Sequence, residues 1–149
     1  MGSTLTNILI HVIFSTKKRE PKIGSEIQED LYRYINGIIK NEGCNLVVIG
    51  GVSDHVHMLI KIKPVCELSE MIKKIKGNSS RWINKEKQLN YNFSWQDGYG
   101  AFSVSESQVP VVVQYIKEQE KHHQKLSFKE EFVRILKLHG LEYDERYLW

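Results

Sequence analysis

The triplet His55-Val56-His57 is the part of the chain best suited to chemistry, because it places two imidazoles around one aliphatic side chain. Side chains of a strand alternate between its two faces. In a strand, both histidines would therefore point to one face, while Val56, Met58 and Ile60 would point into a core. Two neighbouring imidazoles on a rigid strand supply half of a metal site. The same triplet also occurs in strands that bind no metal. Other residues must therefore complete the group of ligands before a metal site can be inferred.

The best candidates for completing such a site are Tyr115 and Gln119, which are four residues apart and would share one helix face. His122 would lie on roughly the same face. A protonated phenol has a pKa of about 10 and is a weak nucleophile, but beside a divalent cation it could attack a phosphorus centre. An amide oxygen with two imidazoles would hold Mg²⁺ or Mn²⁺ loosely. Taken alone, the tyrosine and glutamine could equally be packing or surface residues.

Acidic residues are sparse around the triplet. Asp54 is the one acid next to the histidines in sequence, and we expect it to orient an imidazole from behind rather than bind the cation. The chain shows no clustered set of Asp and Glu of the kind a two-metal nuclease uses.

Length and composition are those of one globular domain spanning residues 1–149, with a formal net charge of +3. The two cysteines, Cys44 and Cys66, are too few for a disulfide framework and favour a reducing compartment. No apolar run reaches the roughly 18 residues that a membrane span needs, and the N-terminus lacks signal-peptide features. We therefore expect a cytoplasmic protein without a membrane partner.

Basic residues gather in two places and are candidates for binding DNA phosphates. They are Lys17, Lys18 and Arg19 in a short loop, and Lys73, Lys74, Lys76 and Arg81 on a helix. A solvated helix face is the alternative for the second group. Trp95 and Tyr99, beside glycines, could stack on bases or pack in the core.

The pattern of apolar and turn-forming residues predicts an α+β fold. We expect strands at 7–14, 46–49, 54–62 and 101–104, a turn at 50–53, and helices at 25–43, 67–87, 107–124 and 127–140. The order of the first six elements matches the ferredoxin-like split β-α-β sandwich with an antiparallel sheet. Two helices would cover one sheet face. The histidines would project from the other, where only the C-terminal helices remain to cover them.

Together these residues resemble the single-tyrosine HUH transposases of bacterial insertion sequences, the IS200-like family, in which HUH denotes two histidines around a bulky hydrophobic residue. The resemblance covers most of the chain: 14–19, 51–59, 95–105, 113–119 and 122–149. The triplet alone is weakly specific. The ordered set that ends in Tyr115-x-x-x-Gln119 is strongly specific.

The resemblance implies a ferredoxin-like sheet with a C-terminal catalytic-tyrosine helix, and a divalent cation held by His55, His57 and Gln119. It implies that Tyr115 attacks a phosphodiester of single-stranded DNA, giving a 5′-phosphotyrosine and a free 3′-hydroxyl, and that a later 3′-hydroxyl attack reseals the DNA. Such proteins recognise hairpins at transposon ends and usually act as homodimers, some with the tyrosine helix exchanged between subunits. Because every matched position is intact, we expect an active enzyme. The resemblance also implies a bacterial cytoplasmic protein that is associated with the nucleoid when it binds DNA.

Three alternatives remain open at this point. One is a domesticated repeat-associated transposase or nickase. Another is a non-catalytic module that binds hairpin DNA or RNA. The third is a phosphoesterase that uses water instead of Tyr115. A homodimer is also expected from an exposed sheet face and from the aromatic tail with Tyr143, Tyr147 and Trp149. His11, His122 and His123 receive no role.

Overall fold

The computed structural model describes residues 2–148, so Trp149 of the aromatic tail lies outside the described residues. The strands are β1 (Ile8–Ser15), β2 (Asn45–Val52), β3 (His55–Ile62) and β4 (Gly100–Val104). The helices are α1 (Ser25–Asn41), α2 (Leu68–Glu86), α3 (Val109–Lys117), α4 (Gln119–His122) and α5 (Phe128–Leu138). Short 3₁₀ turns are η1 (Lys17–Arg19), η2 (Glu106–Gln108) and η3 (Glu145–Tyr147).

The four strands form one antiparallel sheet in the order β2-β3-β1-β4. This order, with α1 and α2 as the two crossovers, is the ferredoxin-like arrangement, and it confirms the predicted α+β fold. In the register, Ser15 of β1 lies opposite His55 of β3, and Ile13 lies opposite His57. The two histidines therefore sit on a central strand, flanked by β1 and β2.

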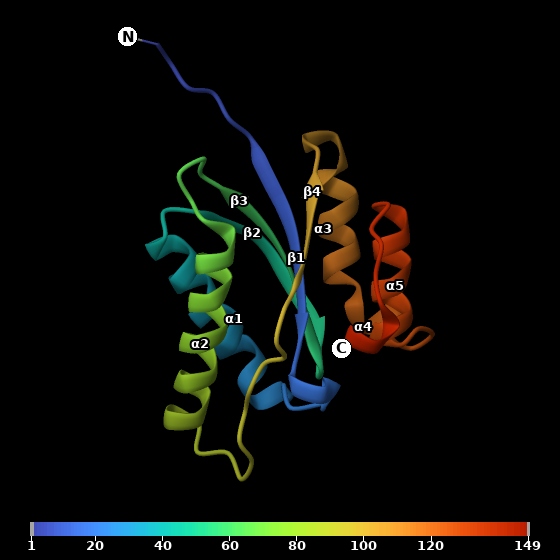
Figure 1. Ribbon diagram of the computed structural model, residues 1–149. Helices are drawn as coiled ribbons and strands as arrows, with labels where there is room; N and C mark the ends of the chain where they lie inside the picture. Colours follow the sequence, from blue (N-terminus) through green and yellow to red (C-terminus); the bar gives the residue numbers. More distant parts are fainter. Residues whose placement is uncertain (1, 149) are drawn as a thin grey trace.

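Helices cover both faces of the sheet, α1 and α2 on one side and α3 to α5 on the other (Figure 1). Val56, Met58 and Ile60 are buried in the same cluster as residues of α1 and α2, as the alternation predicted. On the opposite face, Ile13 and Phe102 pack against Phe132 and its neighbours on α5. That face is therefore covered within the chain, and the expectation of an exposed sheet face was wrong.

The predicted turn at 50–53 was wrong in its first half, because Gly50 and Gly51 belong to β2 and pair with His57 and Val56. The chain reverses at residues 53 and 54 instead. A Cβ on Gly50 would lie 2.3 Å from the carbonyl oxygen of Ile116. Glycine is used here because the backbone of α3 passes directly over the strand, and not because a turn needs its conformational freedom.

The helix expected over 107–124 is broken into η2, α3 and α4. Glu118 separates α3 from α4 with φ −98° and ψ 24°, outside the helical region. Directly after the break, Gln119 is 1% exposed and faces the histidines. The break thus accompanies the burial of the polar Gln119 side chain.

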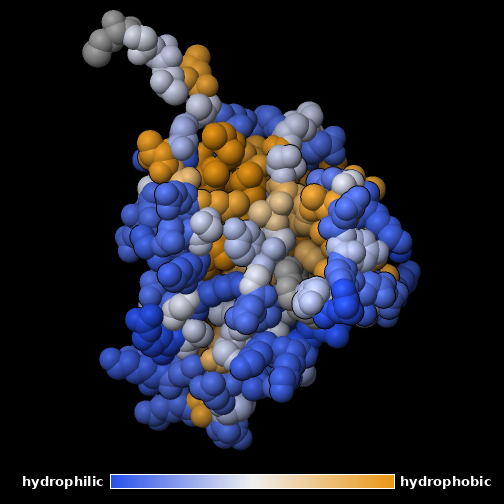
Figure 2. Space-filling model, in the orientation of Figure 1, coloured by the Kyte–Doolittle hydropathy of each residue, from blue (hydrophilic) through white to orange (hydrophobic). Residues whose placement is uncertain are grey.

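Polar residues cover the outer surfaces of the helices and the lower part of the molecule (Figure 2). Hydrophobic residues show mainly between the helix layers in the upper half of this view. Within residues 2–148 we find no helix with the length and apolarity that crossing a bilayer requires.

Candidate active site

His55 and His57 lie at the start of β3 and are both 0% exposed. Their imidazoles point to the face covered by α3 to α5, as the strand alternation predicted. The amide oxygen of Gln119 lies 3.1 Å from His55 Nε2. The structure therefore brings together three of the residues selected from the sequence.

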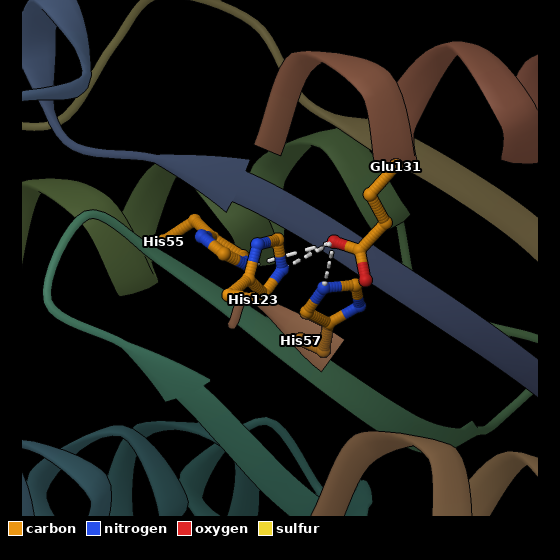
Figure 3. A group of neighbouring side chains, drawn as sticks. All are labelled: His55, His57, His123 and Glu131. Carbon is orange, nitrogen blue, oxygen red and sulfur yellow. Dashed lines mark hydrogen bonds and ion pairs between the residues drawn. The ribbon is translucent and has the colours of Figure 1, made fainter. Parts of the chain in front are cut away.

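Glu131 stands at the centre of this group, although no sequence motif pointed to it. It lies in the first turn of α5, which begins at Ser127, whose hydroxyl oxygen accepts the backbone N–H of Glu130. Its Oε1 lies 3.0 Å from His57 Nε2 and 3.1 Å from His123 Nε2 (Figure 3). One sequence signal was available: Glu131 falls within the apolar stripe of α5, where a charged residue needs buried partners.

These donors fit a divalent cation. One ligand atom each from His55, His57, His123 and Glu131 can be chosen so that all lie within 4.8 Å of one another. Neutral imidazoles and a carboxylate are ordinary ligands of transition cations, and the added carboxylate supplies the negative charge that two histidines and an amide lack. The cluster can therefore hold a metal ion, and the amide oxygen of Gln119 lies beside it, 3.1 Å from His55 Nε2.

Asp54 contacts the outer nitrogen of His55, with 2.6 Å between its Oδ1 and His55 Nδ1. A proton on Nδ1 leaves Nε2 facing the cluster, which is the tautomer that a metal ligand needs. Burial opposes charge on His55, but hydrogen bonds with Asp54 and Glu131 outweigh it and raise the pKa of His55 to about 9. Without a cation, this imidazole is therefore protonated at neutral pH.

The nitrogen of His57 that faces away from the cluster is hydrogen-bonded to another histidine, with His11 Nε2 2.9 Å from His57 Nδ1. Burial lowers the pKa of His57, and burial together with the neighbouring His57 lowers the pKa of His11 to about 3. With both rings neutral, His11 can donate to Nδ1 of His57 only if His57 carries its proton on Nε2. A cation on Nε2 of His57 requires the other tautomer, in which His57 carries its proton on Nδ1 and donates it to His11 Nε2.

Tyr115 donates its hydroxyl proton to Oε2 of Glu131 in a very short hydrogen bond. Its ring centroid is 5.7 Å from that of His57. Burial and the Glu131 carboxylate raise the pKa of the phenol. Burial alone would raise the pKa of Glu131, but hydrogen bonds from His123, His55 and His57 hold it far below its usual range. Tyr115 is thus held protonated beside an ionised carboxylate.

The two C-terminal histidines of α4 behave differently. His123 Nε2 lies within 3.1 Å of both Gln119 Oε1 and Glu131 Oε1, so it belongs to the cluster. The His122 ring stacks against Tyr115 at a centroid distance of 4.7 Å. Its buried Nε2 has no hydrogen-bond partner among the residues that the structure describes.

The basic residues selected from the sequence fall into two separate places. Lys17, Lys18 and Arg19 form η1, which is exposed and directly follows Thr16, whose N–H donates to the carbonyl of Asp54. The other group lies on α2, beyond the opposite face of the sheet, where Lys73 and Arg81 are exposed.

Two lysines of α2 already contact other residues of the protein. Lys74 pairs with Glu42 at 2.8 Å. Lys76 donates to the carbonyls of Gln96 and Gly98, and burial lowers its pKa to about 8.

Trp95 packs in the core against Phe14.

Comparison with known proteins gives this site a family context. The profile described as "Transposase IS200 like" matches residues 4–119. A curated relative, the ISDra2 transposase TnpA of Deinococcus radiodurans, is 27% identical over 115 residues, which cover 73% of this chain and 81% of the relative.

Two solved structures share the fold. One, from Deinococcus radiodurans R1 and described as a transposase, has a TM-score of 0.64 at 25% identity and covers 80% of this chain and 95% of that one. The other, a REP-associated tyrosine transposase bound to a REP hairpin, has a TM-score of 0.63 at 12% identity, with coverage of 83% and 72%. Because the family profile spans most of the sequence, from the first strand to Gln119, this chain belongs to the IS200-like transposase family.

Proposed function

We propose that the protein cleaves and rejoins single-stranded DNA at hairpin-bearing ends through a covalent bond to Tyr115, with a divalent cation as cofactor. One observation carries this proposal. The Tyr115 hydroxyl, two imidazoles of the HUH triplet and Gln119 all meet around the carboxylate of Glu131. A nucleophile beside a cluster of metal ligands is the arrangement that phosphodiester transfer by a side chain requires.

In the proposed reaction, the Tyr115 oxygen forms a bond to phosphorus, and the bond from phosphorus to the 3′-oxygen breaks. The products are a 5′-phosphotyrosine and a DNA strand ending in a 3′-hydroxyl. Glu131 Oε2 accepts the hydrogen bond of the phenol and thereby orients it. The proton that the phenol loses ends on the departing 3′-oxygen, which becomes the 3′-hydroxyl. A later 3′-hydroxyl attacks the phosphotyrosine and regenerates the phenol, so that the phosphodiester is kept rather than hydrolysed.

His55, His57 and Gln119 would hold the cation, and the position of Glu131 makes it a further ligand. A bound Mg²⁺ or Mn²⁺ would polarise the phosphoryl oxygens as a Lewis acid. Asp54 and His11 would keep the two imidazoles in the required tautomers from behind. Lys17, Lys18, Arg19, Lys73 and Arg81 would contact DNA phosphates, with smaller contributions from Lys74 and Lys76, which are already engaged within the protein.

The decisive experiment incubates the protein with single-stranded hairpin oligonucleotides and Mg²⁺ or Mn²⁺, and looks for an adduct that survives denaturation. We expect the adduct with the unaltered protein and none with Tyr115→Phe. Tyr34→Phe is the matched control, because Tyr34 stacks on Trp82 on the other side of the sheet and should leave the adduct intact.

Each alternative predicts a different result. Cleavage that persists in Tyr115→Phe without an adduct would identify a phosphoesterase that uses water. Hairpin binding without cleavage under any metal condition would identify a non-catalytic module. Cleavage directed at dispersed repeat hairpins would favour a domesticated relative.

We also propose a homodimer. Tyr147 of the aromatic tail remains 76% exposed in the single chain, so its ring is available to a second copy of the chain. Sedimentation at micromolar concentration should give twice the mass of the chain. A monomeric mass across that range would contradict the proposal.

A further inference from the structure

A cavity opens beside Tyr115, between α3 and α4 on one side and α5 on the other. Its volume is about 700 Å³, within the range of small-molecule sites. His11, Tyr115 and Glu131 form part of its lining, so it leads directly to the nucleophile and the metal-binding cluster. His55 and His57 are fully buried, whereas Tyr115 is reachable from this cavity.

Two kinds of side chain make up the remaining walls. Apolar surface comes from Val112, Leu126, Ile135 and the exposed Val111 and Leu138. Positive charge comes from Lys121, Lys125 and Arg134, all exposed and without an ion pair among the described residues. A flat apolar surface next to unpaired cations suits a ligand that is itself half aromatic and half anionic.

His122 adds a polar side chain to the wall of the cavity. Its ring lines the cavity and stacks on Tyr115, and no hydrogen bond to another described residue fixes its imidazole. An unpartnered imidazole nitrogen gains a hydrogen bond if the ring turns toward a ligand with donors or acceptors on its edge.

We propose that this cavity binds one of the two nucleotides joined by the scissile phosphate and that His122 contacts the edge of its base. The inference rests on the proposed function, because a phosphodiester under attack by Tyr115 places a nucleotide on each side of that oxygen. The base lies against the apolar walls, and Lys121, Lys125 and Arg134 face the adjoining phosphates. The cavity is thus a site for sequence preference next to the nucleophile, separate from hairpin recognition.

The experiment uses nucleotide binding, which needs no cleavage. The four deoxynucleoside 5′-monophosphates and inorganic phosphate are titrated separately into the metal-free protein, and the methyl signals of Val112 and Ile135 and the imidazole signals of His122 are followed by NMR. We expect saturable shifts that differ among the four bases and are absent with phosphate alone. His122→Ala should reduce the difference among bases while binding remains.

Leu138→Trp fills the mouth of the cavity from a side chain that is 78% exposed, so it leaves the core intact. It should weaken nucleotide binding about tenfold, a loss of about 1.4 kcal/mol. Val65→Trp is the matched control, because Val65 is 89% exposed and lies outside this cavity, in the connection to α2; it should have no effect.

Three results would overturn the inference. Equal shifts with phosphate alone would mean a simple anion site. No shifts with any nucleotide would mean that the cavity is not a nucleotide site. If the protein is a dimer and Leu138→Trp converts it to a monomer, a second copy of the chain occupies the cavity. Adduct formation at Tyr115 alongside any of these results would leave the proposed function standing and remove only the base pocket.

Discussion

The two carboxylate oxygens of Glu131 have different neighbours. Oε1 faces the imidazoles of His57 and His123, and Oε2 faces the hydroxyl of Tyr115. One side chain therefore links the ligands of the proposed cation to the proposed nucleophile. Replacing it should disturb both functions, whereas the neighbouring Glu130 is exposed and serves only the N-terminus of α5.

We predict that Glu131→Gln weakens binding of Mn²⁺ by about tenfold or more, because a neutral amide replaces the charged ligand. Isothermal titration calorimetry measures the affinity without any need for DNA. Glu130→Gln is the matched control and should bind Mn²⁺ like the unaltered protein. Equal affinity in Glu131→Gln would exclude this carboxylate from the ligand set.

The stability of the metal-free protein should fall as the pH rises from 7 to 8. The folded-state pKa of His55 is raised to about 9, above the value of about 6.5 for an unfolded histidine. Its stabilisation is therefore fully present below pH 6.5 and is lost as the pH approaches 9. His11 and His57, whose folded pKa values are lowered, are neutral in both states in this window and do not contribute. Lys76, whose folded pKa is lowered to about 8, adds stability as the pH rises above 8 and offsets His55 there, so the fall is expected only up to that pH.

Urea denaturation at intervals of half a pH unit tests this dependence. Asp54→Asn removes one of the two carboxylates that raise the pKa of His55, so it should reduce the slope between pH 7 and 8. A saturating divalent cation should also reduce the slope, because it displaces the proton from the imidazole. A metal-free protein equally stable at pH 7 and pH 8 would contradict the protonated state of His55.

At the scale of the elements, the position of Tyr115 depends on how closely α3 approaches β2. Gly50 makes that approach possible, since a Cβ there would lie 2.3 Å from the backbone oxygen of Ile116. Ile116 is buried against Leu9 and Leu59, and it is the residue directly after Tyr115. Any outward shift of α3 therefore moves the nucleophile away from His57.

Gly50→Ala should destabilise the protein by about 1–3 kcal/mol, as overpacking of a well-filled interior does, and should reduce adduct formation. Gly37→Ala is the matched control. Gly37 lies in α1 with nothing within 4 Å of an added Cβ, so alanine should stabilise the helix by up to about 1 kcal/mol. Urea denaturation of both variants gives the comparison. A Gly50→Ala protein as stable as the parent would mean that α3 is free to move outward at no cost.

The elements were predictable wherever one local rule decided them. Alternation in β3 correctly placed Val56, Met58 and Ile60 on one face and both histidines on the other. Local rules gave wrong element boundaries where contacts between distant parts of the chain determine the structure. Gly50 looked like a turn residue because a close helix-strand approach leaves no local signature, and the break at Glu118 is linked to buried contacts of Gln119.

Glu131 was missed for a related reason. It lies 12 residues beyond the end of the family profile at Gln119 and 74 residues from its partner His57. The family motif carries no information about it, and its place in the apolar stripe of α5 is the one signal in the sequence. Only the packing of α5 against the sheet, through Phe128 and Phe132, brings this carboxylate to the histidines.

At the scale of the whole molecule, the sheet separates two basic surfaces. The η1 group of Lys17, Lys18 and Arg19 follows the end of β1 beside Asp54 and is therefore close to the histidines. Lys73 and Arg81 on α2 lie beyond the opposite face of the sheet (Figure 1). DNA that contacts both groups must extend around the edge of the molecule.

Salt dependence separates the contributions of these surfaces. Each phosphate contact to a single strand adds about 0.7 to the slope of log affinity against log salt. Replacing Lys17, Lys18 and Arg19 with alanine should therefore reduce the slope for hairpin oligonucleotides by about 2, and replacing Lys73 and Arg81 should reduce it by about 1.4. Lys40→Ala, an exposed charge on α1, is the control and should leave the slope unchanged. If the α2 variant keeps the full slope while the η1 variant loses it, the DNA path is confined to the η1 end, and the lysines of α2 form only a solvated helix surface.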